Sequence, residues 1–333
     1  MTAATALPAP VSRSAAGSLR LERIAPLILL AAAIGVYSAI AVATGQSQYL
    51  TFDNLIGILG RSIALGITAI GQTFAILVAS IDLSVANLIS VSAVLASFIM
   101  SGDPAMMLPA VLAVLGIGAV VGVLNGLIIT QLHVNPLIAT LGMALMLQGL
   151  LSTAFTNFAG SVPVEFQLFA YGEIGGLPIS VPFLVALAVL GWFVLRFTKF
   201  GSNIYAVGGN ADAARLAGVK TSRVIIAAHV ISSLCASIAG LYLASRLRSG
   251  APWIGRDGVY ELESIAVVVI GGTVLAGGRG GVWGTMAGVM IFSLIDSIFN
   301  LAGVDAFAKQ ILRGLVIVAA VAFYAIRSKR IVA

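Results

Sequence analysis

The chain has 333 residues, of which 60% are hydrophobic and 9% are charged, and its formal net charge is +6. A soluble domain carries about 25% charged residues, so this composition cannot cover a water-exposed surface and excludes a soluble globular protein. Apolar runs recur along the whole chain without the alternation over roughly 10 residues that marks a membrane β-barrel. We therefore predict an all-α membrane protein, and since its basic residues lie mostly at the ends of apolar runs, we expect no nucleic-acid partner.

The apolar runs predict about ten transmembrane helices, some of them broken or rich in glycine, because a helix needs about 20 apolar residues to cross a bilayer. The expected spans are 24–43, 56–80, 83–101, 105–130, 136–156, 179–197, 223–245, 261–278, 282–302 and 306–327. Residues 1–23 are expected to form a disordered cytoplasmic leader, 24–327 the membrane domain, and 328–333 a basic cytoplasmic tail.

The first break between spans lies at "ASIDLSVAN", residues 79–87, where Asp82 stands between two hydrophobic runs. Asp82 and Ser84 precede a helix, and a carboxylate there can accept backbone N–H groups at the positive end of the helix dipole. The alternative is that Asp82 lines the pathway, since acids inside membrane segments often serve function. We favour the capping role.

The loops predict the sidedness of the chain. With the N-terminus inside, most Lys and Arg residues fall in the cytoplasm and both termini are cytoplasmic, as the positive-inside bias requires. The long stretch 157–178 then faces outward, and the stretch 198–222 faces the cytoplasm.

The inner stretch contains a short predicted helix from Ala211 to Ala217. Asn210 is a good N-cap, Asp212 lies in the first turn, and Gly218 can close the C-terminus. Such a helix is either a solvated connector or a docking surface for a soluble partner.

Glycine is dense in "SIAVVVIGGTVLAGGRGGVWGTMAG", residues 264–288, which includes Gly271, Gly272 and Thr273. Small residues allow helices to approach closely, and broken helices are tolerated where they line a cavity. The block therefore indicates either tight helix packing or a discontinuous helix beside a translocation path.

A few polar residues within spans are candidates for the pathway. Asp296 and Asn300 share one face of the ninth span with Ser293, and lipid exposure of the acid would cost at least about 2.5 kcal/mol. Gln72 and Asn125 are weaker candidates because amides also join helices. Asp296 is the one plausible coupling acid, which weighs against a carrier driven by an ion gradient and towards energy supplied by another chain.

Several chemistries are excluded or disfavoured by the residues present. No P-loop frame surrounds the lysines, so the chain is not expected to bind or hydrolyse ATP, and we predict no catalytic residues and no cofactor. His133 and His229 have no Cys, His or Glu cluster nearby in the sequence, so no metal site is predicted. An intramembrane protease built on Asp82 and Asp296 remains an alternative.

Four stretches together resemble the permease subunits of bacterial ABC importers for sugars, in the ribose-type branch. They are "ASIDLSVAN", "AVGGNADAARLAGV" at 206–219, "AVVVIGGTVLAGGRGGVWGTMAGV" at 266–289, and the tail "KQILRGLVIVAAVAF". The resemblance covers about residues 52–327 and implies a permease that works in the inner membrane by alternating access.

The resemblance implies the following partners: a second permease chain (as a homodimer or heterodimer), cytoplasmic ATPase subunits that hold ATP and Mg, and an extracytoplasmic solute-binding protein. It also implies that the segment from Gly208 to Gly218 receives the ATPase. The residues concerned are Gly208, Gly209, Asn210, Ala213, Ala214, Arg215 and Gly218.

This sequence departs from the family pattern at several positions. Ala79 and Ser80 stand where the family has two glycines, Ala86 stands where it often has glycine, and Asp296 stands where it tends to have asparagine. The extra acid could bind sugar hydroxyls or favour an amino-bearing cargo. Permeases for branched-chain amino acids or nucleosides, and a stand-alone secondary carrier, remain alternative functions.

Overall fold

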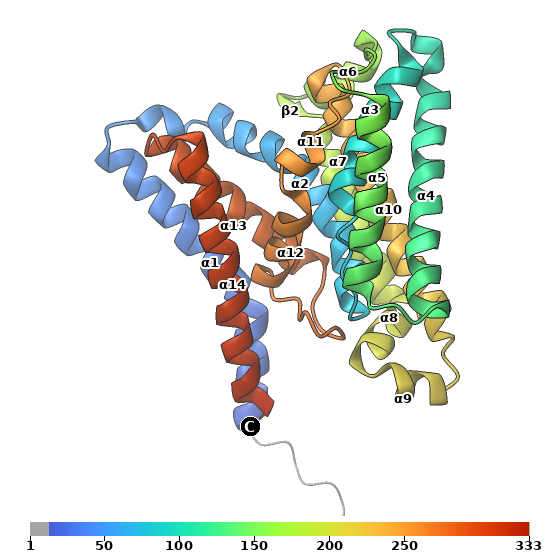
Figure 1. Cartoon of the computed structure of the whole chain (residues 1–333). Helices are drawn as coiled ribbons and strands as arrows, with labels where there is room; N and C mark the ends of the chain where they lie inside the picture. The colour runs from blue at the N-terminus through green and yellow to red at the C-terminus, as the bar shows by residue number, and fades with distance from the viewer. Residues whose placement is uncertain (1–12, 333) are drawn as a thin grey trace, which may run out of the picture.

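The computed structural model describes residues 13–332 and shows a bundle of long helices with one short hairpin (Figure 1). The α-helices are α1 (Arg13–Ala43), α2 (Phe52–Leu77), α3 (Val85–Met100), α4 (Met107–Gln131), α5 (Pro136–Ala154), α6 (Val164–Tyr171), α7 (Ser180–Phe197), α8 (Lys199–Gly209), α9 (Ala211–Leu216), α10 (Thr221–Leu247), α11 (Ile254–Asp257), α12 (Tyr260–Ile270), α13 (Val282–Leu301) and α14 (Ala306–Val332). Two 3-10 turns, η1 (Ser47–Leu50) and η2 (Pro104–Met106), and the two-residue strands β1 (Glu173–Ile174) and β2 (Leu177–Pro178) complete it. The antiparallel hairpin pairs Glu173 with Pro178 and is a small departure from the predicted all-α fold.

Within the described residues, seven helices are long and apolar enough to cross a membrane, which establishes a helical, multi-pass membrane protein. They are α1, α2, α4, α5, α7, α10 and α13. The other predicted spans fall on α3, α12 and α14, and two of these are short: α3 has 16 residues and α12 has 11. At 1.5 Å per residue, α12 is only about 16 Å long, so 261–278 does not form the continuous span that we predicted.

Helix α10 lies at the centre of the bundle and packs against α2, α3 and α4. Glycines on α4, spaced four residues apart, let it approach α10 closely. A Cβ atom on Gly122 would lie 2.5 Å from the Cα of Val230, and one on Gly126 would lie 2.6 Å from the Cα of Ile226. This stripe of small residues is the packing device expected between helices in lipid.

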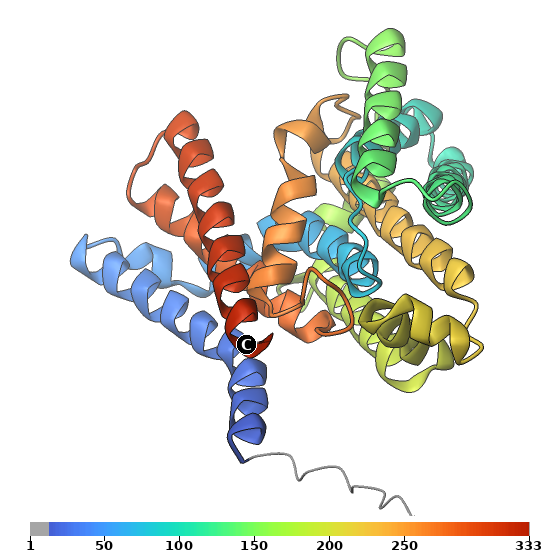
Figure 2. The same ribbon diagram turned by 60° about the horizontal axis from the view of Figure 1, so that its bottom comes forward.

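The helices form two groups, and α2 packs against both. It contacts α10 and α7 in the larger group, and α13 and α12 in the smaller one. Figures 1 and 2 show α1 and α14 together on one side of the molecule, with α4 and α5 on the other side.

The two ends of the bundle differ in the segments that they carry. Helices α8 and α9 lie at one end, together with the start of α1 and the end of α14, whereas α6, β2 and α11 lie towards the other end (Figure 1). This arrangement agrees with a chain whose termini share a side with residues 198–222. Which end faces the cytoplasm remains a prediction.

Some segments that we predicted to lie outside the helices are helical in the structure. Helix α1 begins at Arg13, so residues 13–23 are helical where we expected a disordered leader, while residues 1–12 lie outside the described part. Helix α14 likewise continues to Val332 through the predicted tail. Most of the stretch 198–222 is helical, as α8 and α9.

Candidate functional site

The break between α2 and α3 forms a turn, residues 78–84, which we call the Asp82 turn. The Asp82 side chain is fully buried, and its Oδ1 accepts hydrogen bonds from the backbone N–H of Ser84 (3.0 Å) and the Ser84 hydroxyl (2.5 Å). Ser84 itself is the N-cap residue of α3 and makes no side-chain cap bond. The prediction that Asp82 caps α3 is therefore wrong: the carboxylate fastens the turn that precedes the helix.

Two amides predicted as pathway candidates support this turn. Asn125 Nδ2, on α4, donates to the Ser84 hydroxyl at 3.0 Å. The Gln72 amide, on α2, faces the backbone of Asp82: with its nitrogen towards the Asp82 carbonyl and its oxygen towards the Asp82 N–H, the distances are 3.2 and 3.3 Å. The structure thus brings Gln72, Asp82, Ser84 and Asn125 into one buried cluster.

The partner that the sequence analysis missed is His229. We considered it only as a metal ligand, whereas it lies inside α10 and is fully buried. Its Nε2 lies 2.8 Å from the Ser80 hydroxyl, and its Nδ1 lies 3.8 Å from Asp82 Oδ2. His229 therefore joins the central helix to two of the polar side chains of the Asp82 turn, Asp82 and Ser80, the latter at one of the positions where the family has glycine.

Several buried polar atoms of this region have no hydrogen-bond partner in the described part of the chain. Among the residues that the structure describes, Asp82 Oδ2, Asn125 Oδ1, His229 Nδ1 and Ser232 Oγ are buried without a hydrogen-bond partner. An unsatisfied buried polar atom costs about 1–3 kcal/mol. Breaking or changing the remaining contacts of this cluster would therefore leave further polar groups unpaired in the core.

Helix α9 lies where the capping residues Asn210 and Gly218 predicted a short helix. Asn210 Oδ1 accepts the backbone N–H of Ala213 at 2.9 Å, and Gly218 follows the helix with a positive φ of 85°. Ala214 is buried, whereas Leu216, at 91% exposure, and Arg215 point away from the protein. The short helix presents an apolar and a basic side chain at the tip of the bundle.

Gly208 connects this segment to the Asp82 turn. A Cβ atom at Gly208 would lie 1.8 Å from the Leu77 carbonyl oxygen and 2.5 Å from the Gly278 nitrogen. Gly278 N–H in turn donates to the Leu77 carbonyl at 3.0 Å. The end of α2, the end of α8 and the glycine-rich block therefore meet at one point, which we call the glycine junction (Leu77, Gly208 and Gly278).

The glycine-rich block forms a loop, residues 271–281, between α12 and α13. Gly272 and Gly278 adopt positive φ angles, and Thr273 Oγ1 accepts the N–H of Gly281 at 3.3 Å across the loop. Tyr205 of α8 donates its hydroxyl to the Gly280 carbonyl at 3.0 Å. The discontinuous helix that we considered is thus present, and Gly271, Gly272 and Thr273 lie in its break.

Asp296 and Asn300 lie apart from the buried cluster. Arg313 of α14 donates to Asp296 Oδ1 from Nη2 (2.5 Å) and Nε (3.1 Å), and its Nη1 lies 3.2 Å from Glu263 Oε1 on α12. Asn300 accepts from Lys309 at 2.5 Å, near the turn into α14. Asp296 therefore belongs to an ion cluster that joins α12, α13 and α14.

Comparison with known proteins identifies the family. Residues 54–321 match the model of the family described as branched-chain amino acid transport system / permease component. The chain belongs to this permease family. No solved structure matches it.

Curated relatives of this permease cover most of its length. The ribose import permease proteins RbsC of Escherichia coli (strain K12) and Bacillus subtilis (strain 168) are 36% and 38% identical to it, over 84% and 85% of this chain and 88% of each relative. The L-arabinose transport system permease protein AraH of Escherichia coli (strain K12) is 36% identical, over 88% of this chain and 89% of that protein.

Proposed function

We propose that this permease is the membrane subunit of an ATP-binding-cassette importer that carries a sugar or sugar-like polyol across a bacterial inner membrane. The observation that carries the proposal is its likeness, over more than four-fifths of the chain, to permeases named for ribose and L-arabinose and, at 33% identity, to the galactose/methyl galactoside import permease of Haemophilus influenzae. The description of the family, which names branched-chain amino acids, supports the same architecture with a different cargo as the alternative.

The proposed division of labour assigns energy and delivery to other chains. ATPase subunits, which hold ATP and Mg, would dock on α9, and an extracytoplasmic binding protein would deliver the sugar at the opposite end of the bundle. A second permease chain, identical or different, would complete the pathway.

The coupling route that we propose follows the contacts of α8. A push on Arg215 and Leu216 would move α8, whose Gly208 and Tyr205 touch the end of α2 and the loop 271–281. Leu77 directly precedes the Asp82 turn, and a Cβ atom at Gly277 of the loop would lie 2.7 Å from the Ala79 nitrogen within that turn. Because that turn is fastened to α10 through His229, the movement would reach the central helix.

Reconstitution tests this proposal. Proteoliposomes that contain the permease, its ATPase and its binding protein should take up D-ribose, L-arabinose or D-galactose only when ATP is present at the cytoplasmic face. Uptake of L-leucine instead, or uptake without ATP, would contradict the cargo or the energy source, respectively.

A charge reversal tests the docking surface. Arg215→Glu should abolish uptake and the stimulation of ATPase activity while the protein still inserts in the membrane. Lys220→Glu makes the same charge change outside α9 and is the matched control, which should retain most uptake. Normal transport by Arg215→Glu would refute docking on α9.

A further inference from the structure

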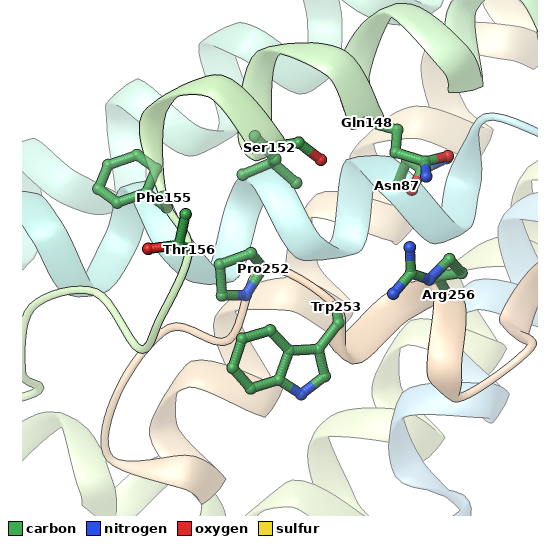
Figure 3. Close-up of a pocket in the computed structure, with 9 residues that line it drawn as sticks. Asn87, Gln148, Ser152, Phe155, Thr156, Pro252, Trp253 and Arg256 are labelled. Atoms are coloured by element: carbon green, nitrogen blue, oxygen red, sulfur yellow. The ribbon is translucent and has the colours of Figure 1, made fainter.

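A groove outside the buried cluster opens between α3, α5 and the segment that leads into α11 (Figure 3). Its volume is about 240 Å³. The side chains that carry its chemistry are Asn87, Gln148, Ser152, Thr156, Trp253 and Arg256. Figure 3 shows Trp253 and Arg256 on one wall, facing Asn87, Gln148 and Ser152 on the other.

The α11 wall is held firmly against α3. Gly255 N–H donates to the Ser90 hydroxyl at 2.9 Å, and a Cβ atom at Gly255 would lie 1.7 Å from the Ala86 carbonyl oxygen. Ala159 and Gly250 exchange backbone hydrogen bonds of 2.8 and 3.1 Å just before this wall. The backbone that carries Trp253 and Arg256 is therefore held in place by the fold.

The polar groups that face the groove retain hydrogen-bonding capacity. Asn87 Nδ2 donates to the Ala144 carbonyl at 2.9 Å, which leaves its oxygen for a ligand. Arg256 uses Nε towards Asp257 Oδ1 at 3.4 Å, so its two terminal nitrogens remain. Gln148 supplies both a donor and an acceptor, and the Ser152 and Thr156 hydroxyls can do either.

We infer that this groove binds a neutral polyhydroxylated ligand, an aldose or polyol, on its way into the permease; the inference rests on the proposed function. Planar amides and a guanidinium can each contact two neighbouring hydroxyls, while the indole of Trp253 offers an apolar face to ring carbons. The lining residues, all in the described part of the chain, include one cation and no carboxylate. The neighbouring carboxylate of Asp257 is paired with Arg256, so the ammonium group of an amino acid would find no free counter-charge among the lining residues.

The position of the groove suits a first contact with the cargo. It lies at the C-terminal end of α5 and beside α11, at the end of the bundle away from α9 (Figure 1). A solute released at that end would meet Trp253 and Arg256 before it could approach the Asp82 turn. In this inference the groove selects the cargo before the cargo can reach the buried cluster around Asp82.

Trp253 provides the reporter for the test. The chain has three tryptophans, and the other two, Trp192 and Trp283, pack against each other with ring centroids 6.4 Å apart. The full-length variant with Trp192→Phe and Trp283→Phe would be placed in lipid nanodiscs and titrated with D-ribose, L-arabinose, D-galactose and L-leucine. At least one sugar should change the Trp253 fluorescence with a saturable curve, and L-leucine should not.

Substitutions in the groove give the decisive comparison. Gln148→Leu and Arg256→Met should each weaken sugar binding about five- to tenfold, as expected for a lost hydrogen bond. Gln131→Leu is the matched control: it makes the same Gln-to-Leu change at the end of α4 away from the groove, and it should bind the sugar with the affinity of the parent. A flat titration with all three sugars, saturation by L-leucine, or equal affinities in parent and groove variants would overturn the inference.

Uptake separates this inference from the proposed function. In the reconstituted complex, Gln148→Leu should raise the KM for the sugar with a smaller change in maximal rate. An unchanged KM would refute the groove and leave the importer proposal standing. Failure of the unaltered complex to take up any sugar with ATP would refute the importer proposal, and the inference with it.

Discussion

Gly208→Ala is the sharpest test of the route from α9 to the Asp82 turn. The added methyl group would lie 1.8 Å from the Leu77 carbonyl oxygen and 2.5 Å from the Gly278 nitrogen, and since Cβ contacts under 3.0 Å essentially do not occur, α8 must shift by about 1.2 Å or more. Forcing a methyl group into a close-packed contact costs about 1–3 kcal/mol. Separating Leu77 from Gly278 would lose a further hydrogen bond, worth about 1 kcal/mol.

The neighbouring glycine is the matched control. A Cβ atom at Gly209 would meet nothing within 4 Å, and alanine is a better helix former than glycine by about 1 kcal/mol. Gly209→Ala should therefore leave stability unchanged or slightly raise it, although both changes add the same methyl group to the end of α8.

The assay combines thermal unfolding in detergent with uptake by the reconstituted complex. We expect Gly208→Ala to lower the Tm by several degrees and to reduce uptake at least tenfold, with ATP binding by the partner intact. Gly209→Ala should match the unaltered protein in Tm and should retain far more uptake than Gly208→Ala. Equal Tm and equal uptake for the two variants would refute the glycine junction as the contact that transmits motion.

Three further substitutions test the contacts described above. Arg313→Met should destabilise the protein by about 3 kcal/mol because it leaves Glu263 buried without its cation, and adding Glu263→Gln should restore part of the loss in the same unfolding assay; an unchanged Tm would show that the ion cluster contributes little to stability. Ala79→Gly should raise the Tm slightly, by the equivalent of at most about 1 kcal/mol, because Ala79 adopts φ 59°, where alanine is strained and glycine is not; a fall in Tm would contradict this. His229→Leu should cost about 1–3 kcal/mol and lower uptake, since Asp82 loses its neighbour in the core, whereas normal uptake would remove this histidine from the proposed route.

The features that the sequence predicted best depend on residues close to one another in the chain. The cap of α9 is local: Asn210 and Ala213 are three residues apart, and a glycine at 218 follows. The dense glycines of residues 264–288 likewise limited the alternatives to tight helix packing or a broken helix, and the structure has a break at residues 271–281. Such signals arise from backbone conformation, which nearby residues determine.

The features that were missed depend on distant pairs. Ser80 and His229 are 149 residues apart, so nothing in the sequence told us that α10 places this histidine beside the Asp82 turn. The Asp296–Arg313 pair was more accessible to prediction. The two residues lie at nearly equal distances from the turn at 302–305, and antiparallel neighbours joined by a short turn bring such positions side by side.

The glycine junction also has a consequence for the order in which the chain assembles during synthesis. Helix α12 is too short to hold itself across a bilayer, and the loop 271–281 that follows it is fixed by Leu77 and Gly208, which leave the ribosome earlier. Residues 260–301 therefore depend on α2 and α8 being in place before them. A substitution in α2 or α8 that disturbs this template would be seen as poor insertion or degradation of residues 260–301, far along the chain from the change itself.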